Sequence, residues 1–451
     1  MHFLSLFLFP PDAGLIRFDT LAVIMAALVS FLGVIIIRFA ARYLEGDPKR
    51  SRFLVYMTLT LLSVIVLVIS NHLLLLLGAW VAVSLFLHKL LLHHPDRSGA
   101  VFAARKKFVF SRLAELSFLA AALLLHSGHD TWRIDELVSS ITAGNHAGLP
   151  AAAFLIALTA MLKSAQFPFH SWLPDTMDTP TPVSAFMHAG IINAGGFIVL
   201  RFAPVFTAAP SALHLLAVVG TLTAVFGAIV MLAQTGVKRA LAFSTIAQMG
   251  FMMIQIGLGA WGLALLHLVA HSLYKAFAFL QAGSTIGAAP RAAIPLGNGA
   301  LAMGTVAGTV MVFSASGAMH YLFPTTVATP MVFLVILSLA LAYGIARATS
   351  AYVGSLPRAL AVALGISLLA LALHFTAVHL LATPVPPPVP MWLWAFVGVS
   401  FVMLFFFQAL LWRASAHPLG RKLFVHALSG FYVGTVANRF LNGLWPSRKS
   451  Q

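Results

Sequence analysis

The sequence predicts an all-α, polytopic membrane protein with about thirteen membrane-spanning helices. Of the 451 residues, 60% are hydrophobic and only 8% are charged, whereas an ordinary soluble domain carries about 25% charged residues. Apolar runs of about 20 residues, each long enough to cross a bilayer, recur from one end of the chain to the other. A soluble enzyme of this length would need polar surface that the chain does not have.

The apolar runs place the spans and divide the chain. They lie near residues 19–41, 53–70, 72–92, 108–127, 151–168, 183–203, 211–233, 237–258, 260–286, 298–320, 330–348, 358–381 and 391–412. Five prolines between residues 384 and 390 predict a stiff, extended connector before the last span. Residues 1–414 therefore form a transmembrane domain. The tail, residues 415–451, mixes apolar and basic residues, which fits a helix on the membrane face or a surface that docks a partner subunit.

The basic residues predict the orientation of the spans. One side carries most of them: Arg42, Lys49, Arg50, Arg52, Arg97, Arg105, Lys106, Lys107, Arg112, Lys238, Arg239, Arg291, Arg347, Arg358, Arg413, Arg421, Lys422, Arg439, Arg448 and Lys449. The other side has Arg17, Arg133 and Arg201. The positive-inside rule puts the N-terminus outside and the C-terminus in the cytoplasm, in agreement with an odd number of spans.

Composition also excludes several classes of function. The net charge of +16 suggests nucleic acid, but no basic patch is interleaved with aromatic residues, so we expect no nucleic-acid binding. The absence of cysteine excludes disulfides and thiolate metal sites in this chain. Without a Gly-Lys-Ser/Thr phosphate loop, the chain cannot hydrolyse a nucleotide through that motif. Residues 1–9 lack a basic start, and we expect no cleaved signal peptide.

Lys163 is the most informative residue of the chain. It lies in an apolar segment, residues 151–167, where a charged side chain costs roughly 3 kcal/mol on insertion scales. A charge kept at this depth usually binds, carries or gates ions. Phe167 precedes Pro168, which disfavours helical conformation, so the sequence predicts a broken helix here. Broken helices free backbone carbonyls and are a common construction of ion sites.

Glu115 is the partner that we expect for Lys163. It alone, among eleven acidic residues, falls within a predicted span, next to the span of Lys163. An ion pair between adjacent helices would lower the cost of both charges. Separation of the pair would act as a switch that sets the proton affinity of the amine. The alternative is a static structural salt bridge.

Further titratable groups extend this candidate path for ions or protons. His188 lies among small residues that leave room for water, so it could relay protons or simply hydrogen-bond between helices. His267, His271 and Lys275 are spaced four and four and share one helix face. Two such histidines can bind zinc, but no acidic partner is near in sequence and the lysine would repel a cation, so we favour proton hopping. Lys238 at a helix start could conduct or anchor.

These segments resemble the antiporter-like subunits of respiratory complex I and of Mrp sodium/proton antiporters, over about residues 15–350. The resemblance rests on residues 162–168 (LKSAQFP), 172–175 (WLPD), 179–185 (TPTPVSA), 188 (His), 234–250 (QTGVKRALAFSTIAQMG) and 267–275 (HLVAHSLYK). It implies two inverted five-helix repeats, about residues 53–203 and 211–348. It also implies that Lys163 is the central channel lysine, with Glu115 as its acidic partner. His188, His267, His271 and Lys275 would belong to a polar axis.

The chain departs from that family at several places. Trp80 is followed by Val81 where the family usually has a glutamate, and Gly236 stands where relatives often carry an acid. The span near 298–320 lacks the lysine that the family would have there. The resemblance therefore leaves open whether the second repeat forms an ion channel of its own, as it does in complex I subunits. The resemblance further implies that the first two helices and the long lateral helix of the family are missing.

Within the family, the chain looks most like the DabB-type membrane subunits of inorganic-carbon accumulation complexes. The shortened architecture and the stretches 94–97 (HPDR) and 104–108 (ARKKF) carry this likeness. It implies a bacterial inner-membrane subunit, not itself an enzyme, that passes H⁺ or Na⁺. The flow of these cations would energise CO₂ hydration in a cytoplasmic DabA-like partner that is similar to zinc β-carbonic anhydrases. Zinc would then belong to the partner, and this chain would hold no cofactor.

Two alternatives to this reading stay open. One is a proton-pumping or sodium/proton antiporter subunit of a complex I-like or Mrp-like assembly. The other is a structural membrane anchor for a soluble enzyme, whose polar residues would tolerate neutral substitution.

Overall fold

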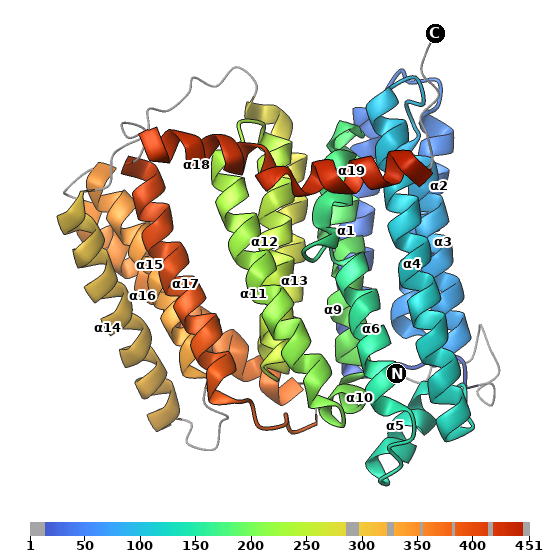
Figure 1. Cartoon of the computed structure of the whole chain (residues 1–451). Helices are drawn as coiled ribbons and strands as arrows, with labels where there is room; N and C mark the ends of the chain where they lie inside the picture. Colours follow the sequence, from blue (N-terminus) through green and yellow to red (C-terminus); the bar gives the residue numbers. More distant parts are fainter. Residues whose placement is uncertain are drawn as a thin grey trace.

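The computed structural model describes residues 14–285, 297–322, 329–351, 355–380, 384–413 and 418–444. Within these ranges the protein is a helical bundle, and twelve helical segments are long and apolar enough to cross a membrane (Figure 1). With the shorter apolar helix Leu149–Lys163, they confirm the predicted polytopic fold of about thirteen spans. Arg291, Arg448, Lys449 and residues 1–9, used above for orientation and targeting, lie outside the described residues.

The twelve spans follow the predicted order. They are α1 (Thr20–Tyr43), α2 (Arg50–Ile69), α3 (Leu73–Leu91), α4 (Ser98–His129), α8 with α9 (Thr181–Ala189 and Ala194–Arg201), α11 (Pro210–Ala233), α12 (Val237–Gly257), α13 (Trp261–Leu280), α14 (Asn298–Leu322), α15 (Met331–Ala351), α16 (Leu356–Leu380) and α17 (Met391–Arg413). Shorter helices are α5 (Ile134–Thr142), α6 (Leu149–Lys163), α7 (Trp172–Asp175), α10 (Ala203–Thr207), α18 (Pro418–Leu428) and α19 (Val433–Leu444). Five described 3₁₀ segments are η2 (Phe169–Ser171), η3 (Thr176–Asp178), η4 (Ile191–Asn193), η5 (Ala282–Thr285) and η8 (Gly430–Tyr432). Residues 384–390 form no helix or strand, as the prolines predict.

Helix α4 is longer than its apolar run suggests. The sequence predicts a span from about residue 108, but the helix begins at Ser98. Lys106 and Lys107, which the predicted spans leave in the loop before residue 108, are therefore helical, and both side chains are buried. The loop assignment of these two lysines is wrong, because an apolar run ends at a charge whether or not the helix ends there.

Two helices break at membrane depth. Helix α6 ends at Lys163, as Pro168 predicts, and Ala165 after it has a positive φ of 49°. A second break, which the sequence reading did not anticipate, separates α8 from α9 at residues 190–193. The Ser164 hydroxyl donates to the Ile192 carbonyl over 2.6 Å, so the two breaks contact each other.

Glycines set the approach of α11 and α12. A Cβ on Gly220 would lie 2.6 Å from the carbonyl oxygen of Gly250, and one on Gly257 would lie 2.5 Å from the backbone nitrogen of Ala217. The backbones of the two helices therefore touch, which only residues without a side chain allow. This contact holds α12 beside α11.

The three arginines of the opposite side are neutralised by carboxylates. Arg17 pairs with Asp19 over 2.8 Å, and Arg201 forms a buried ion pair with the same carboxylate. Asp19 also caps α1 by accepting the backbone N–H of Ala22 over 2.9 Å. The start of α1 is thereby fastened to the end of α9.

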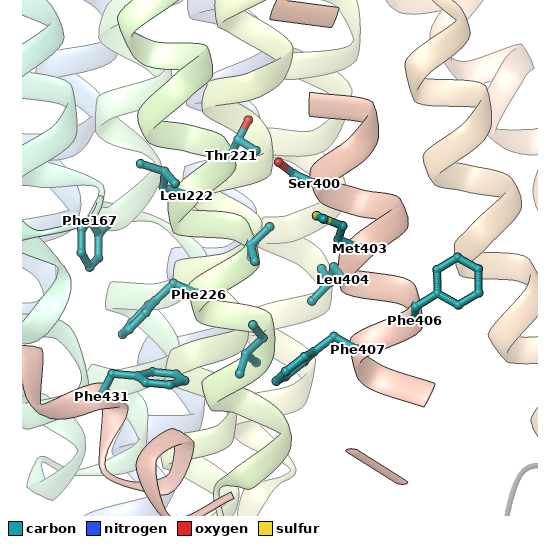
Figure 2. A pocket seen from close by; sticks show the side chains of 12 residues that line it. Phe167, Thr221, Leu222, Phe226, Ser400, Met403, Leu404, Phe406, Phe407 and Phe431 are labelled. Atoms are coloured by element: carbon teal, nitrogen blue, oxygen red, sulfur yellow. The ribbon is translucent and has the colours of Figure 1, made fainter. Parts of the chain in front are cut away.

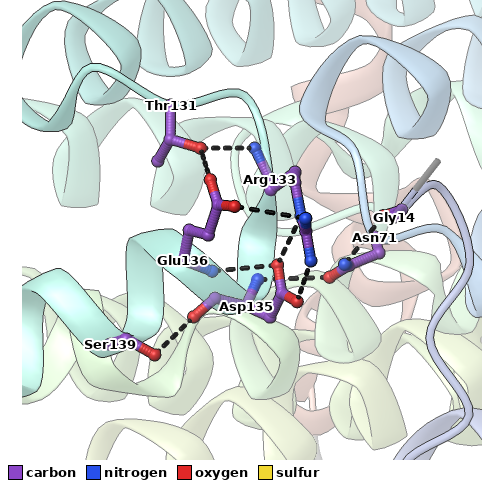
Figure 3. A network of polar contacts seen from close by, with 7 residues as sticks. All are labelled: Gly14, Asn71, Thr131, Arg133, Asp135, Glu136 and Ser139. Carbon is purple, nitrogen blue, oxygen red and sulfur yellow. Dashed lines mark hydrogen bonds and ion pairs between the residues drawn. The ribbon is translucent and has the colours of Figure 1, made fainter. Parts of the chain in front are cut away.

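Arg133 belongs to a second network at this side, shown in Figure 3. Its guanidinium lies 2.7 Å from Asp135 and 3.2 Å from Glu136. The Asn71 amide donates to the Gly14 carbonyl over 2.9 Å and accepts the backbone N–H of Asp135 over 3.1 Å. Burial raises the pKa of Asp135, but these hydrogen bonds outweigh it and hold the pKa below its ordinary value. The network joins the first described residues to the start of α5.

The tail lies across one end of the bundle, with α18 and α19 running from α17 past α11 toward α4 (Figure 1). The Gln234 side chain donates to the Leu428 carbonyl over 3.2 Å, and the Phe431 ring lies 6.1 Å from that of Phe226. Lys106 donates to Asn438 over 2.6 Å. The tail therefore contacts α4 on one side of the bundle and α11 on the other.

Gly250→Ala tests the close contact of α11 and α12. Its Cβ would lie 2.5 Å from the backbone nitrogen of Ala224, so we expect a loss of about 1–3 kcal/mol in unfolding free energy, as for other overpacked cores. The measurement is unfolding of the purified protein in detergent. Gly78→Ala is the control, since a Cβ there meets nothing within 4 Å and alanine favours a helix. Equal stability of both variants would contradict the contact.

Candidate functional site

The ion pair expected between Glu115 and Lys163 is present. Nζ of Lys163, the last residue of α6, lies 2.9 Å from Oε1 of Glu115 on α4. Arg112, one turn earlier on α4, lies 2.6 Å from the other carboxylate oxygen. The Trp80 ring on α3 lies 5.3 Å from the amine, where a cation is attracted by the aromatic face. Trp80 thus packs against the amine of Lys163.

Lys107 is a site residue that the sequence reading missed. Its amine donates to the Ser84 carbonyl over 2.8 Å and to the Ser84 hydroxyl over 3.1 Å. Lys107, Ser111 and Glu115 are buried and spaced four and four on α4, so they share one helix face. That spacing was the signal in the sequence, hidden by the loop assignment.

Lys106 forms a separate polar cluster under the tail. Its buried amine contacts the Ser171 carbonyl (3.2 Å), Asp175 (2.8 Å) and Asn438 (2.6 Å). The charge is matched by one carboxylate, while a residue of α19 completes its shell. No pattern in the sequence could pair residues 332 positions apart.

Hydrogen bonds connect the broken helices to the centre of the molecule. Ser164 follows Lys163 directly and donates to the Ile192 carbonyl. The next residue, Asn193, donates from its side chain to the Ser272 hydroxyl on α13 over 2.7 Å. A line of polar groups therefore leads from the Lys163 site to α13.

The second cluster joins His188 to Lys275. Nδ1 of His188 lies 2.9 Å from the Thr245 hydroxyl, and that hydroxyl donates to the Leu241 carbonyl over 3.1 Å. The Lys275 amine donates to the same carbonyl over 3.1 Å. His188 also stacks on Phe279 at 4.5 Å. Both predicted residues are fully buried and lie in one hydrogen-bonded set.

His267 and His271 continue along α13, as their spacing predicts. Their ring centroids are 5.9 Å apart, and Nδ1 of His267 lies 2.9 Å from the Gln255 side-chain oxygen. A cavity of about 360 Å³ lies against this pair, between α12 and α13, with Tyr274 and Gln255 in its wall. The row therefore ends at a space large enough for water.

Lys238 is held at the first turn of α12. Its amine donates to the carbonyls of Met177 (2.9 Å) and Thr179 (2.8 Å). These contacts fit the anchoring alternative and bring the lysine to the connection that follows α7.

One group of side chains in the described part of the chain could hold a metal ion. Asp47, His93 and His94 place potential ligand atoms within 4.8 Å of one another, between the α1–α2 and α3–α4 connections. A hydrogen bond of 2.9 Å already joins His93 to Asp47, and it lowers the pKa of that carboxyl. The expectation that this chain carries no metal stays a prediction.

The ion pair makes an asymmetric prediction for stability. Glu115→Gln leaves Lys163 without a carboxylate, and removal of one partner of a buried pair costs about 3–5 kcal/mol. Lys163→Met leaves Glu115 paired with Arg112, so it should cost clearly less. Denaturant unfolding of both variants and of the double variant measures this order. A Lys163→Met protein as unstable as Glu115→Gln would contradict it.

Comparisons with known proteins place the chain in a family. Residues 70–316 match the model described as NADH:quinone oxidoreductase/Mrp antiporter, TM, and residues 15–54 match the model described as NADH-Ubiquinone oxidoreductase (complex I), chain 5 N-terminus. A chain of the Mrp complex from Dietzia sp. has the same fold, with a TM-score of 0.62 and 24% identity, covering 98% of this chain and 54% of that one.

Individual relatives agree with this match. The probable inorganic carbon transporter subunit DabB of Hydrogenovibrio crunogenus is 44% identical over 269 residues, 59% of this chain and 52% of the relative. DabB2 of Halothiobacillus neapolitanus is 46% identical over 60% of this chain and 49% of its own. Subunit L of the NADH-quinone oxidoreductase of Mycobacterium tuberculosis is 36% identical over 278 residues, which are 61% of this chain and 44% of the relative. The chain spans about half the length of these curated relatives. Since the match covers more than half of the chain, the protein belongs to the transmembrane family of NADH:quinone oxidoreductase and Mrp antiporter subunits.

Proposed function

We propose that the chain is the cation-translocating membrane subunit of an assembly that accumulates inorganic carbon. The observation that carries this proposal is the Glu115–Lys163 ion pair at the end of a broken helix. From the residue after Lys163, hydrogen bonds run from Ser164 to Ile192 and from Asn193 to Ser272 on α13, the helix that also carries Lys275. A cation that enters such a site can displace the lysine charge from its carboxylate. The likeness to DabB subunits supports inorganic carbon as the purpose.

The proposed path has two clusters in series. In the first, Glu115 exchanges its partner Lys163 for a proton or for Na⁺. In the second, His188, Lys275, His271 and His267 relay protons toward the cavity between α12 and α13. Lys238 anchors the segment between α7 and α8 through the carbonyls of Met177 and Thr179, at the entrance of the proposed path. The path would run through a multi-pass subunit of a bacterial inner membrane with its C-terminus in the cytoplasm.

The partner that we propose is a cytoplasmic, DabA-like protein that holds zinc and hydrates CO₂. Catalysis then belongs to the partner, and this chain supplies energy from the cation gradient. The tail offers a docking surface, because α18 and α19 cover one end of the bundle and Asn438 contacts Lys106 of the first half.

Lys163→Met tests the translocation role. We expect cells that express the full assembly to lose growth at ambient CO₂ and uptake of labelled bicarbonate, since the switchable charge is gone. Lys89→Met is the matched control, because Lys89 is an exposed lysine at the end of α3. Membrane levels of both variants are compared by immunoblot. Normal bicarbonate uptake in Lys163→Met cells would refute the role and favour a structural anchor.

Purification of the chain from native membranes tests the partner. We expect one large cytoplasmic protein to co-purify, with about one zinc ion per complex by elemental analysis. Recovery of redox or sodium/proton antiporter subunits instead would assign the chain to a complex I-like or Mrp-like assembly, as its 36% identical relatives suggest.

A further inference from the structure

One cavity lies outside the proposed ion path. It has a volume of about 730 Å³ and lies between α11 and α17, as Figure 2 shows. Its walls are apolar apart from two hydroxyl groups: Phe167, Thr221, Leu222, Val225, Phe226, Ile229, Ser400, Met403, Leu404, Phe406, Phe407 and Phe431. Both helices are membrane-spanning, so the bilayer is the solvent of this cavity.

The volume restricts what can occupy the cavity. A spanning helix about 10 Å wide and about 30 Å long would need roughly 2,400 Å³, which is more than three times the space. The value of about 730 Å³ instead falls within the range of about 300–1,000 Å³ that is typical of sites for small molecules. The wall offers no ionic group to such a molecule. An acyl chain fits these conditions.

The tail closes one end of the cavity. Gly430, Phe431 and Tyr432 all have positive φ (59°, 49° and 62°), a conformation that costs free energy in non-glycine residues. The turn places Phe431 against Phe226, 6.1 Å away, in the cavity wall. The strained turn therefore shapes the cavity rather than only connecting α18 to α19.

The charged side chains that α12 and α18 carry near this end are all basic. Helix α18 contacts both α11 and α17, and its Arg421 and Lys422 are exposed, as is Arg239 on α12. No acidic residue occurs anywhere from position 179 to position 451. Helices α11, α12, α17 and α18 therefore supply no carboxylate to these basic side chains. Basic groups beside a pocket between membrane helices bind anionic lipid headgroups.

We propose that the cavity between α11 and α17 is a binding site for one anionic phospholipid. One acyl chain lies between Leu222, Phe226 and Met403, and the phosphate is held by Arg421 and Lys422 of α18. The lipid occupies the space under the tail and supports the turn at Phe431. Because Phe167 also lines the cavity, three residues from Ser164, the site adjoins the break that ends α6.

Native mass spectrometry of the full chain with defined lipids tests this site. We expect one phosphatidylglycerol to be retained in preference to phosphatidylcholine. Arg421→Gln with Lys422→Gln should weaken retention of phosphatidylglycerol about 30-fold, because each basic side chain near a membrane surface gives an about fivefold preference for anionic lipid. Lys49→Gln with Arg50→Gln is the charge control, since both residues are exposed basic residues near the start of α2, far from α17 in the sequence. Equal weakening in both double variants would overturn the site.

A second pair of variants tests the cavity itself. Ser400→Phe fills it from α17, whereas Ser63→Phe adds the same ring to a half-exposed serine of α2. We expect only Ser400→Phe to abolish retention of the lipid. Retention by both variants would overturn the proposal, as would the appearance of an acidic protein, in place of lipid, bound to wild type through Arg421 and Lys422.

Photolabelling of the unmodified protein avoids any folding defect. Phosphatidylglycerol with a diazirine in its acyl chain should label peptides that contain residues 221–229 and 400–407. Labelling spread evenly over α2, α14 and the other lipid-facing helices would contradict a specific site.

Discussion

The architecture of the first half depends on one ion pair, between Lys163 and Glu115. A single charge in the apolar interior of a membrane protein is expensive, and its partner must come from a neighbouring helix. Glu115 therefore fixes the register of α4 against α6, with Lys163 at the last residue of α6. Arg112 and Trp80 complete the surroundings of the pair from two sides. The same charges that make the site costly thus hold its helices in place.

The connection between the two halves consists partly of backbone groups. Ser164 bonds to the Ile192 carbonyl, and Lys275 and Thr245 both bond to the Leu241 carbonyl. A backbone carbonyl oxygen accepts hydrogen bonds but has no proton to donate. These contacts therefore position side chains and do not themselves relay protons. On the proposed path, proton transfer between the clusters would pass through hydroxyl groups, imidazoles or water. The breaks in α6 and between α8 and α9 expose the carbonyls that make this alignment possible.

The sequence allowed much of the fold and the central pair to be predicted, for local reasons. Apolar run length gives the spans, Pro168 predicts the end of α6, and a spacing of four places His267, His271 and Lys275 on one face. The missed features depend on contacts between distant segments. Lys107 contacts Ser84 of another helix, and Lys106 contacts Asn438 of the tail.

Helix breaks without proline are also hidden from the sequence. The interruption at residues 190–193 has no proline and arises where α8 meets the Ser164 turn. Similarly, α4 continues through Lys106 and Lys107 because Asp175 and Ser84 accept hydrogen bonds from their amines. Tertiary partners, rather than local preference, decide where these helices end.

The lysines of the membrane domain are stabilised by different means. Lys106 and Lys163 each have a carboxylate, Asp175 and Glu115. Lys238 and Lys275 donate their described hydrogen bonds to carbonyl oxygens, and the chain has no acid after Asp178. Carbonyl dipoles stabilise an ammonium less than a carboxylate does in an apolar medium. A positive charge on Lys106 or Lys163 is therefore held more strongly than one on Lys275, or on Lys107, whose amine bonds to the carbonyl and the hydroxyl of Ser84.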